Sequence, residues 1–434
     1  MPSPSLRRRQ LAIIALLFVG YASLYFCRAD LSVATPLLVE ELVGRGLSQR
    51  DALWWIGTFT SIGTFGYALG KLFLGGLGDY WGGRINFLIG LAGAVLFTVL
   101  FAVTGLIPIF TLAWFGNRLT QSLSWAGLIK VSSKWFNFSS YGTVLGVLSV
   151  SFLIGDAAAR QMMGSLIHHG FGWRTLFYVA AAVAAVCLTV NFLFLRESRT
   201  DLGFQAAQPN PLNLYGASDS RPPSVSALLR PLFRSPAFQL VCLLSFALTI
   251  VRETFNNWTP EYLHAHLGLS AGDAGSFSAV FPAVGAVSVL ITGWLSDRLG
   301  VNGRALLMFI GLTLATAALI ALVSIPAGTG TTIAPLVAIA AVAFCLLGPY
   351  SYLGGAFALD FGGRQGSAVA SGMIDGIGYI GGILAGTSVT QISGAYGWQG
   401  VFVALAVVTA LATLASGMLY ALRYRAAAIQ QTAQ

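Results

Sequence analysis

Long apolar stretches separated by short polar ones dominate the chain. A helix rises 1.5 Å per residue, so about 20 apolar residues cross the ~30 Å hydrocarbon core of a bilayer. The 434 residues contain twelve such stretches. They lie at about 11–36, 53–77, 85–105, 108–132, 142–167, 174–195, 237–262, 274–296, 305–324, 332–359, 367–392 and 398–421. The pattern predicts an all-α membrane protein with twelve transmembrane helices.

The composition agrees with this prediction and narrows the class of protein. Hydrophobic residues make up 56% of the chain and charged residues only 9%, whereas soluble domains carry about 25% charged residues. So few charges exclude a soluble enzyme and a disordered protein. The net charge of +9 does not indicate nucleic acid, because the basic residues lie between apolar stretches and form no continuous face. The expected surroundings are the lipid bilayer.

The distribution of Lys and Arg predicts the orientation. Fifteen of the 24 fall in one set of loops and three in the opposite set, and six lie within predicted spans. Positively charged loops stay in the cytoplasm, so we expect a multi-pass protein of the cell (inner) membrane with both termini cytoplasmic. The apolar run after Arg7–Arg9 is too long for a cleaved signal peptide and is expected to remain as the first helix.

Two landmarks recur along the chain and indicate an internal repeat. Gly75-Gly-Leu-Gly-Asp79 follows the second span, and Gly293-Trp-Leu-Ser-Asp297 follows the eighth. Trp173 and Trp398, each after an aromatic residue and Gly, precede the sixth and twelfth spans. The offsets are 218 and 225 residues. We therefore expect two pseudo-symmetric six-helix halves, 1–196 and 237–434, joined by a cytoplasmic linker at 197–236.

The repeated Gly-x-Leu-x-Asp loop is a candidate gate. In each half the Asp is followed by an Arg, which gives the pairs Asp79 with Arg84 and Asp297 with Arg298. Such a charged latch at the cytoplasmic rim would bias the protein between inward-closed and inward-open states. The alternative is an ordinary capped loop at the headgroups.

Charges inside the predicted spans mark a candidate anion path, because a charge in mid-bilayer is costly and usually functional. Arg28 and Arg252 are 224 residues apart, which matches the repeat. Two guanidinium forks, one per half, suit a dianion such as phosphate. Lys71 adds a third cation, and Tyr25 and Tyr67 lie in helical register with Arg28 and Lys71.

The alternative for these arginines is private pairing with a neighbouring acid. Asp30 and Glu253 are the nearest acids in sequence, but both are expected to face away from their arginines, at i+2 and i+1. Asp156 and Arg160 differ, because their acid-first i,i+4 spacing favours a structural salt bridge.

Other chemistry has little support in the sequence. Gly66–Lys71 lacks the spacing and the Ser/Thr of a phosphate-binding loop, so ATP-driven transport is not indicated. The four His and four Cys form no metal-binding pattern. We expect no enzyme activity, no cofactor and no metal.

At these positions the chain resembles the organophosphate:inorganic-phosphate antiporter family of the major facilitator superfamily. The resemblance covers nearly the whole chain. The matching segments are Tyr21–Arg28, Pro36–Glu41, Tyr67–Lys71, Gly78-Asp79, Lys130–Phe136, Arg252–Tyr262, Gly348–Leu359 and Gly378–Gly382. It implies rocker-switch exchange of an organic phosphate or phosphonate for inorganic phosphate. The implied phosphate site is Arg28 and Arg252 with Lys71 nearby, and Tyr25, Tyr67 and Tyr379 would line the cavity. Lys130 is a further candidate, and a monomer is expected.

Two departures from the family pattern leave other functions open. Ser124-Trp-Ala stands where the family commonly has Trp-Pro-Pro, and Phe152 where some members place a histidine. The segment 28–36 also resembles the anion:cation symporters, which carry sugar acids and other carboxylates. A proton-coupled symporter could use Glu253, Asp156 or Asp375 to carry the proton. A membrane sensor for sugar phosphates is the third possibility.

Overall fold

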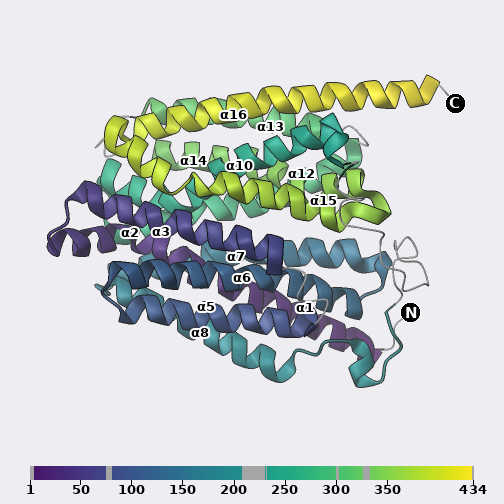
Figure 1. Ribbon diagram of the computed structural model, residues 1–434, viewed down its shortest axis with the longest axis horizontal. Coiled ribbons are helices and arrows are strands. Elements are labelled where there is room, and N and C mark those ends of the chain that lie inside the picture. The colour runs from purple at the N-terminus through teal and green to yellow at the C-terminus, as the bar shows by residue number, and fades with distance from the viewer. Residues whose placement is uncertain are drawn as a thin grey trace. The chain divides into compact units, whose positions relative to one another are not determined.

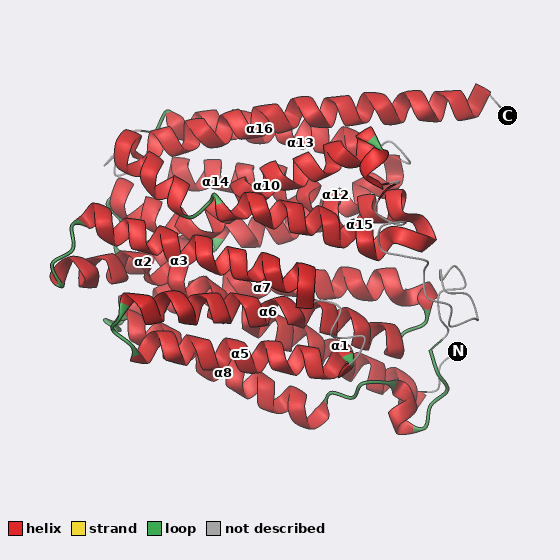
Figure 2. Cartoon of the chain, viewed as in Figure 1, coloured by secondary structure: helices red, strands yellow, loops and turns green. Residues whose placement is uncertain are grey.

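The regular structure of the described residues is entirely helical (Figures 1 and 2). The structure is a computed structural model that describes residues 4–74, 81–207, 230, 232–299, 303–325 and 333–432. Within these ranges the side chains of residues 4, 138–143, 297, 359–360, 362–369 and 423–432 are not described. Asp79 and the side chain of Asp297, both predicted gate residues, therefore lie outside the described part.

The helices of the first half correspond to the first six predicted spans. They are α1 (Pro4–Leu24), α2 (Phe26–Gly44), α3 (Gln49–Leu69) with the π-turn η1 (Gly70–Leu74), α5 (Gly83–Val103), α6 (Ile107–Trp135), α7 (Phe138–His168) and α8 (Trp173–Phe194). A short 3₁₀ turn, η2 (Arg199–Leu202), follows α8.

The helices of the second half cover the remaining predicted spans. They are α10 (Pro236–Glu261), η3 (Tyr262–His266), α11 (Ala271–Phe277), α12 (Val280–Leu299), α13 (Gly303–Val323), α14 (Ile333–Ser351), η4 (Leu353–Phe357), α15 (Ala358–Ile383) and α16 (Thr387–Thr432).

Several predicted spans are not single straight helices. The first is divided at Tyr25 between α1 and α2, and α2 has a kink at Cys27, which leaves helical geometry at φ −81° and ψ 19°. The predicted eleventh span is interrupted between α15 and α16. Gly397, at φ 66°, then breaks α16 just before the predicted twelfth span. A positive φ is readily adopted by glycine, so this break has a clear local cause.

Glycines allow helices of the first half to pack closely. A Cβ on Gly127 of α6 would lie 2.6 Å from the Gly83 carbonyl oxygen of α5, a distance that no real side chain tolerates. Small residues at such contacts are typical of helices packed within a membrane.

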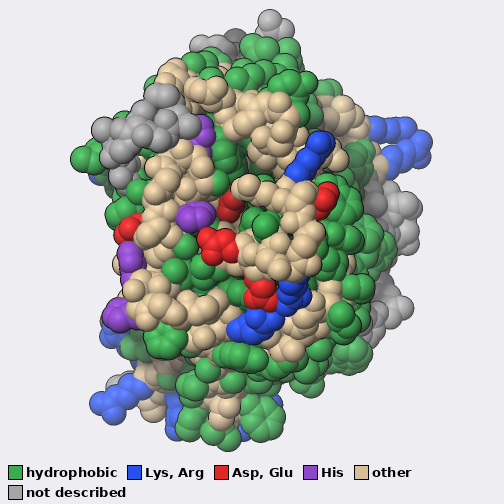
Figure 3. Space-filling model, turned by 90° about the vertical axis from the view of Figure 1, so that its left-hand side faces the viewer, with side chains coloured by type: hydrophobic (Ala, Val, Ile, Leu, Met, Phe, Trp, Pro, Cys, Tyr) green, Lys and Arg blue, Asp and Glu red, His purple; other side chains and the backbone are tan. Residues whose placement is uncertain are grey.

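Large apolar side chains remain exposed along the helices, as expected for surfaces that face lipid. Leu96 is 63% exposed, Phe192 60% and Leu411 61%. Hydrophobic side chains cover much of the flanks of the face drawn in Figure 3. Nine stretches of the described residues are long and apolar enough to cross a membrane, one of them covering both predicted spans eleven and twelve.

Contacts divide the chain into two compact units. One comprises Met1–Asn213 with Leu269–Ala279, and the other comprises Leu214–Gly268 with Val280–Gln434. The short helix α11 thus groups with the first unit, although by sequence it belongs to the second repeat. The boundaries predicted at 196 and 237 stay predictions.

Candidate anion-binding site

In the first unit a cluster of cations surrounds the ring of Tyr67. The guanidinium carbon of Arg28 lies 4.7 Å from the centre of this ring, and Lys71 Nζ lies 5.6 Å from it. Arg28 Nη1 also donates a hydrogen bond of 3.1 Å to Tyr25 Oη. The predicted grouping of Tyr25 with Arg28 and of Tyr67 with Lys71 is therefore confirmed. We call Tyr25, Arg28, Tyr67, Lys71 and Arg118 the Arg28 cluster.

Arg118 of α6 belongs to this cluster, although the sequence patterns did not assign it to the site. Its guanidinium carbon lies 5.2 Å from the Tyr67 ring centre, and the residue is 3% exposed. The buried Asp30 interacts electrostatically with Arg118. Three cations thus surround one aromatic ring, and guanidinium and ammonium groups are donors that bind an anion.

Local backbone structure brings these side chains together. The break between α1 and α2 falls at Tyr25, so the ring precedes the first turn of α2, which carries Arg28. The π-turn η1 begins at Gly70 and carries Lys71. Single π-turns within helices are frequent at functional sites.

The second unit carries a comparable cluster around Arg252 of α10. The guanidinium carbon lies 4.5 Å from the Tyr350 ring centre and 5.5 Å from that of Tyr379. Nη2 donates a hydrogen bond of 3.1 Å to Tyr379 Oη. Tyr379 was predicted as a neighbour of the site, whereas Tyr350 was not assigned. We call Arg252, Glu253, Tyr350 and Tyr379 the Arg252 cluster.

The expectation that Glu253 faces away from Arg252 is wrong. Arg252 Nη2 donates a hydrogen bond of 2.6 Å to Glu253 Oε1, and Glu253 is only 2% exposed. Adjacent helical residues diverge at Cβ, but the long arginine side chain folds back far enough to reach the acid. One guanidinium nitrogen, Nε, is buried without a hydrogen-bond partner among the described residues. The Arg252 cluster thus contains a carboxylate in direct contact with its guanidinium.

The predicted salt bridge between Asp156 and Arg160 is confirmed. Arg160 Nε donates to Asp156 Oδ1 at 3.0 Å, and Arg160 is 2% exposed. Arg160 Nη1 also lies 3.2 Å from Ser278 Oγ and 3.5 Å from Ser32 Oγ. This buried network joins α7 to α2 and to the residue that follows α11.

Two further predicted site residues differ in their relation to the arginine clusters, because Lys130 lies far from Arg118 along α6 whereas Asp375 interacts with Tyr350 of the Arg252 cluster. Lys130 is twelve residues beyond Arg118 in α6, about 18 Å along the helix. It lies beside Gly83 at the start of α5. Asp375 of α15 lies against Gly354, where a Cβ would be 2.5 Å from Oδ1, and it interacts electrostatically with Tyr350.

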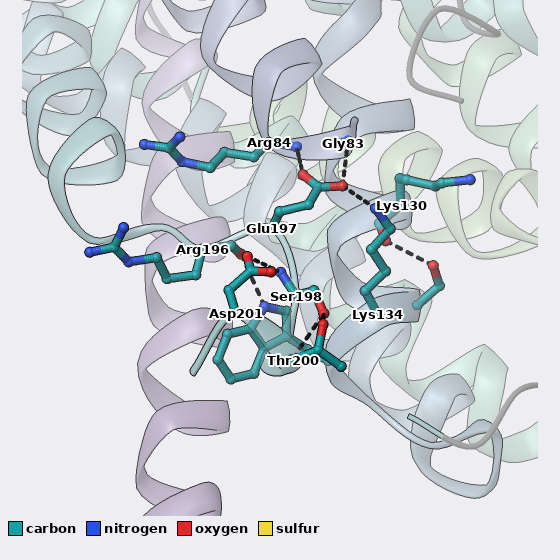
Figure 4. A network of polar contacts seen from close by, with 11 residues as sticks. Gly83, Arg84, Lys130, Lys134, Arg196, Glu197, Ser198, Thr200 and Asp201 are labelled. Carbon is teal, nitrogen blue, oxygen red and sulfur yellow. Dashed lines mark hydrogen bonds and ion pairs between the residues drawn. The ribbon is translucent and has the colours of Figure 1, made fainter. Parts of the chain in front are cut away.

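The start of α5 is held by a polar network centred on Glu197 (Figure 4). The carboxylate accepts hydrogen bonds from the backbone N–H of Gly83 at 2.9 Å and of Arg84 at 2.6 Å. Lys134 Nζ lies 2.6 Å from Glu197 Oε1. In the figure the amine of Lys130 points away from this carboxylate. A carboxylate at a helix N-terminus satisfies unpaired N–H groups and the helix dipole.

These contacts set the pKa of Glu197. Burial alone would raise it, but the hydrogen bonds from Lys134, Arg84 and Gly83 outweigh burial and hold the pKa of the carboxyl below its ordinary value of 4.5. The carboxylate is therefore charged at neutral pH and acts as a fixed anchor.

The predicted gate residues Arg84 and Arg298 make other contacts in the described part of the chain. Arg84 Nη2 donates to the Phe192 carbonyl at 2.6 Å. The guanidinium carbon of Arg298 lies 3.9 Å from the ring centre of Trp294. The latch with Asp79 and Asp297 stays a prediction.

The chain belongs to the Major Facilitator Superfamily, whose family model matches residues 17–386. Proteins of this family are membrane transporters rather than enzymes. The twelve-helix architecture expected from the sequence is the fold of this superfamily.

Sequence relatives confirm the resemblance to the organophosphate:inorganic-phosphate antiporter family. A "Probable hexose phosphate transport protein" of Chlamydia pneumoniae is 26% identical over 92% of this chain and 88% of its own length. The "Glycerol-3-phosphate transporter" of Bacillus subtilis (strain 168) is 22% identical over 92% and 89%. The "Membrane sensor protein UhpC" of Escherichia coli (strain K12) is 22% identical over 93% and 90%.

Solved structures agree on the fold. A bacterial homolog of the human lysosomal transporter Spinster, inward-facing and unoccupied, superposes with a TM-score of 0.76 at 16% identity, covering 97% of this chain and 98% of that one. The D-xylose-proton symporter gives a TM-score of 0.70 at 14% identity, covering 94% and 97%.

Proposed function

We propose that this protein exchanges an organic phosphate or phosphonate for inorganic phosphate by alternating access. Its relatives are named for phosphorylated solutes. The observation that carries the proposal is that each unit holds one arginine against two tyrosine rings, at positions 224 residues apart. Guanidinium forks bind phosphate oxygens bidentately, and tyrosine hydroxyls can complete the hydrogen bonds.

The guanidinium of Arg252 contacts Glu253, which suggests an order of events. The phosphate group would first be attracted to the three cations of the Arg28 cluster, Arg28, Lys71 and Arg118. Arg252 would then bind the same anion by exchanging its contact with Glu253 for a phosphate oxygen. Binding by both arginines would favour the closed state, because the anion would bind the closed state more tightly than the open one.

This arrangement would couple the two fluxes. Without an anion, bringing Arg28 and Arg252 toward one another would place like charges in a medium of low dielectric, where repulsion is strong. With a dianion between them the repulsion is offset. The carrier would therefore reorient mainly when loaded, which is the behaviour of an exchanger.

Counterflow in proteoliposomes tests the proposal. Vesicles are loaded with radioactive phosphate, and sugar phosphates, glycerol phosphate, phosphonates or sugar acids are added outside, with and without a pH gradient. Efflux that requires an external phosphorylated compound supports exchange. Binding of a sugar phosphate without efflux would contradict exchange and indicate a sensor.

The contact between Arg252 and Glu253 favours one alternative function, proton-coupled uptake of an organic anion. Protonation of this buried acid would release the arginine for a substrate carboxylate. The "Probable L-galactonate transporter" of Escherichia coli (strain K12) is 26% identical over 70% of this chain. Uptake of sugar acids that collapses with the pH gradient would support this alternative over exchange.

We further propose that both termini lie in the cytoplasm and that a monomer is the working unit. The orientation rests on the basic loops, fifteen residues against three. Labelling of single cysteines placed at position 3 and at position 47, from each side of intact cells, tests it. Labelling at position 3 from outside would reverse the assignment.

A further inference from the structure

A groove runs between α1 and α8 of the first unit, outside both arginine clusters. Its volume is about 670 Å³, within the range of small-molecule sites. Its walls are mainly apolar, and they include Ile13, Leu16 and Val19 of α1 and Val186, Val190 and Phe194 of α8. Arg9 and Arg196 lie at one end of the same groove.

The length of the groove matches one leaflet of a bilayer. It extends over ten residues of α1, from Arg9 to Val19, and along α8 from Val186 to the helix end at Phe194, with Arg196 two residues further on. At 1.5 Å per residue this is about 15 Å, which is half of the ~30 Å hydrocarbon core. The two arginines are thus at headgroup depth when the apolar part is at acyl-chain depth.

The charged end of the groove is held in place by hydrogen bonds. Gln10 Nε2 donates to the Trp135 carbonyl at 2.9 Å, and Trp135 Nε1 donates to the Arg196 carbonyl at 3.0 Å. This chain links the residue after Arg9 to the backbone of Arg196. In Figure 4 the Arg196 side chain points away from the Glu197 carboxylate. Among the described residues neither Arg9 nor Arg196 forms an ion pair, and both are exposed.

The groove also contains a polar group that its apolar walls do not satisfy. Asn191 lines it and is 1% exposed, and its Oδ1 has no hydrogen-bond partner among the described residues. It lies in the last turn of α8, five residues before Arg196. Asn191 Nδ2 donates to the Cys187 carbonyl at 2.9 Å, so this amide is a polar element in an otherwise apolar wall.

From these observations we infer that the groove between α1 and α8 binds an anionic phospholipid. One acyl chain lies along the apolar walls, and the phosphate lies between Arg9 and Arg196. Clusters of basic residues at the cytoplasmic surface attract anionic lipids, and the predicted orientation places this end of α1 in that leaflet. The site is separate from the transport path, so it does not depend on the proposed substrate.

The test uses the full-length protein in detergent and two lipids with identical acyl chains, phosphatidylglycerol and phosphatidylcholine. Native mass spectrometry counts retained lipid, and thermal unfolding measures stabilisation. We expect phosphatidylglycerol to be retained and to stabilise the protein more than phosphatidylcholine. The double variant Arg9→Gln/Arg196→Gln should bind phosphatidylglycerol at least about tenfold more weakly, because it removes both positive charges that attract the lipid phosphate.

Two further variants test separately whether the position of the charge and the apolar wall of the groove matter for lipid binding. Arg8→Gln removes a neighbouring exposed charge that does not line the groove and should leave lipid binding unchanged. Ala15→Trp fills the apolar wall, where Ala15 is exposed, and should weaken binding although both arginines remain. Equal retention of the two lipids, or an undiminished affinity for phosphatidylglycerol in the double variant, would overturn the inference.

Discussion

At the scale of single residues, the two arginines differ more than their repeat positions suggest. The sequence patterns correctly grouped Arg28 with Tyr25 and Lys71 with Tyr67, because helical register brings residues three or four apart together. They missed the Arg252–Glu253 contact, because register describes Cβ directions and not the reach of a long side chain. They gave no site role to Arg118 and Tyr350, which reach the clusters from other helices. No spacing within one helix could reveal those contacts.

The Arg252–Glu253 contact yields a prediction for affinity. Glu253→Gln removes the charge that competes with substrate phosphate for the guanidinium. Charge-assisted hydrogen bonds contribute about 1.5–3 kcal/mol, so we expect the half-saturation concentration for phosphate to fall about tenfold or more. Initial exchange rates at varied external phosphate measure this, with Glu40→Gln, an exposed acid, as the matched control. An unchanged half-saturation concentration would show that Glu253 does not compete with the anion.

The Asp156–Arg160 pair is predicted to be structural rather than proton-carrying. Removing one partner of a buried pair leaves an uncompensated charge and typically costs about 3–5 kcal/mol, whereas replacing both partners with apolar residues is often tolerated. Arg160→Met should therefore lower the unfolding temperature clearly, and Asp156→Leu/Arg160→Met should recover most of it. A folded double variant that has lost exchange would instead favour a role for this acid in coupling.

At the scale of helices, the apolar stretches predicted nearly every span but not the breaks within the spans. Neither the break at Tyr25 nor the kink at Cys27 falls at a proline or glycine, and Arg28 follows the kink directly. The π-turn that carries Lys71 starts at a glycine, but many glycines in this chain lie within regular helix. The predicted gap between spans eleven and twelve, residues 393–397, does include Gly397, where α16 is kinked.

The cap on α5 gives a prediction with a pH dependence. Glu197→Gln loses the ion pair with Lys134 and weakens the hydrogen bonds to the start of α5, so we expect stability to fall by about 1–2 kcal/mol at pH 7. Because the folded-state pKa of Glu197 lies below its ordinary value of 4.5, the wild type loses this stabilisation as the pH falls through the folded-state pKa. Thermal unfolding of both proteins between pH 7 and pH 3 measures it. If the unfolding temperatures of the two proteins differ by the same amount at every pH, the charge of Glu197 is not the source of the stabilisation.

At the scale of the whole molecule, the sequence predicted the class of protein but not the contacts between segments that are far apart along the chain. Hydropathy and the repeat were sufficient for the fold, because the membrane permits few architectures for apolar segments of this length. The grouping of α11 with the first unit was not predictable, since it depends on packing between segments far apart in sequence. The gate pairs with Asp79 and Asp297 stay predictions.

The central claim is that one guanidinium fork from each half binds the phosphate group. It is tested most directly by phosphate self-exchange in proteoliposomes with Arg28→Lys and Arg252→Lys, and with Arg50→Lys, an exposed arginine outside both clusters, as the control. A lysine keeps the positive charge but cannot make the bidentate contact. The account predicts that exchange falls about tenfold to a hundredfold in each cluster variant and is unchanged in the control. Near-wild-type exchange in either cluster variant would contradict it.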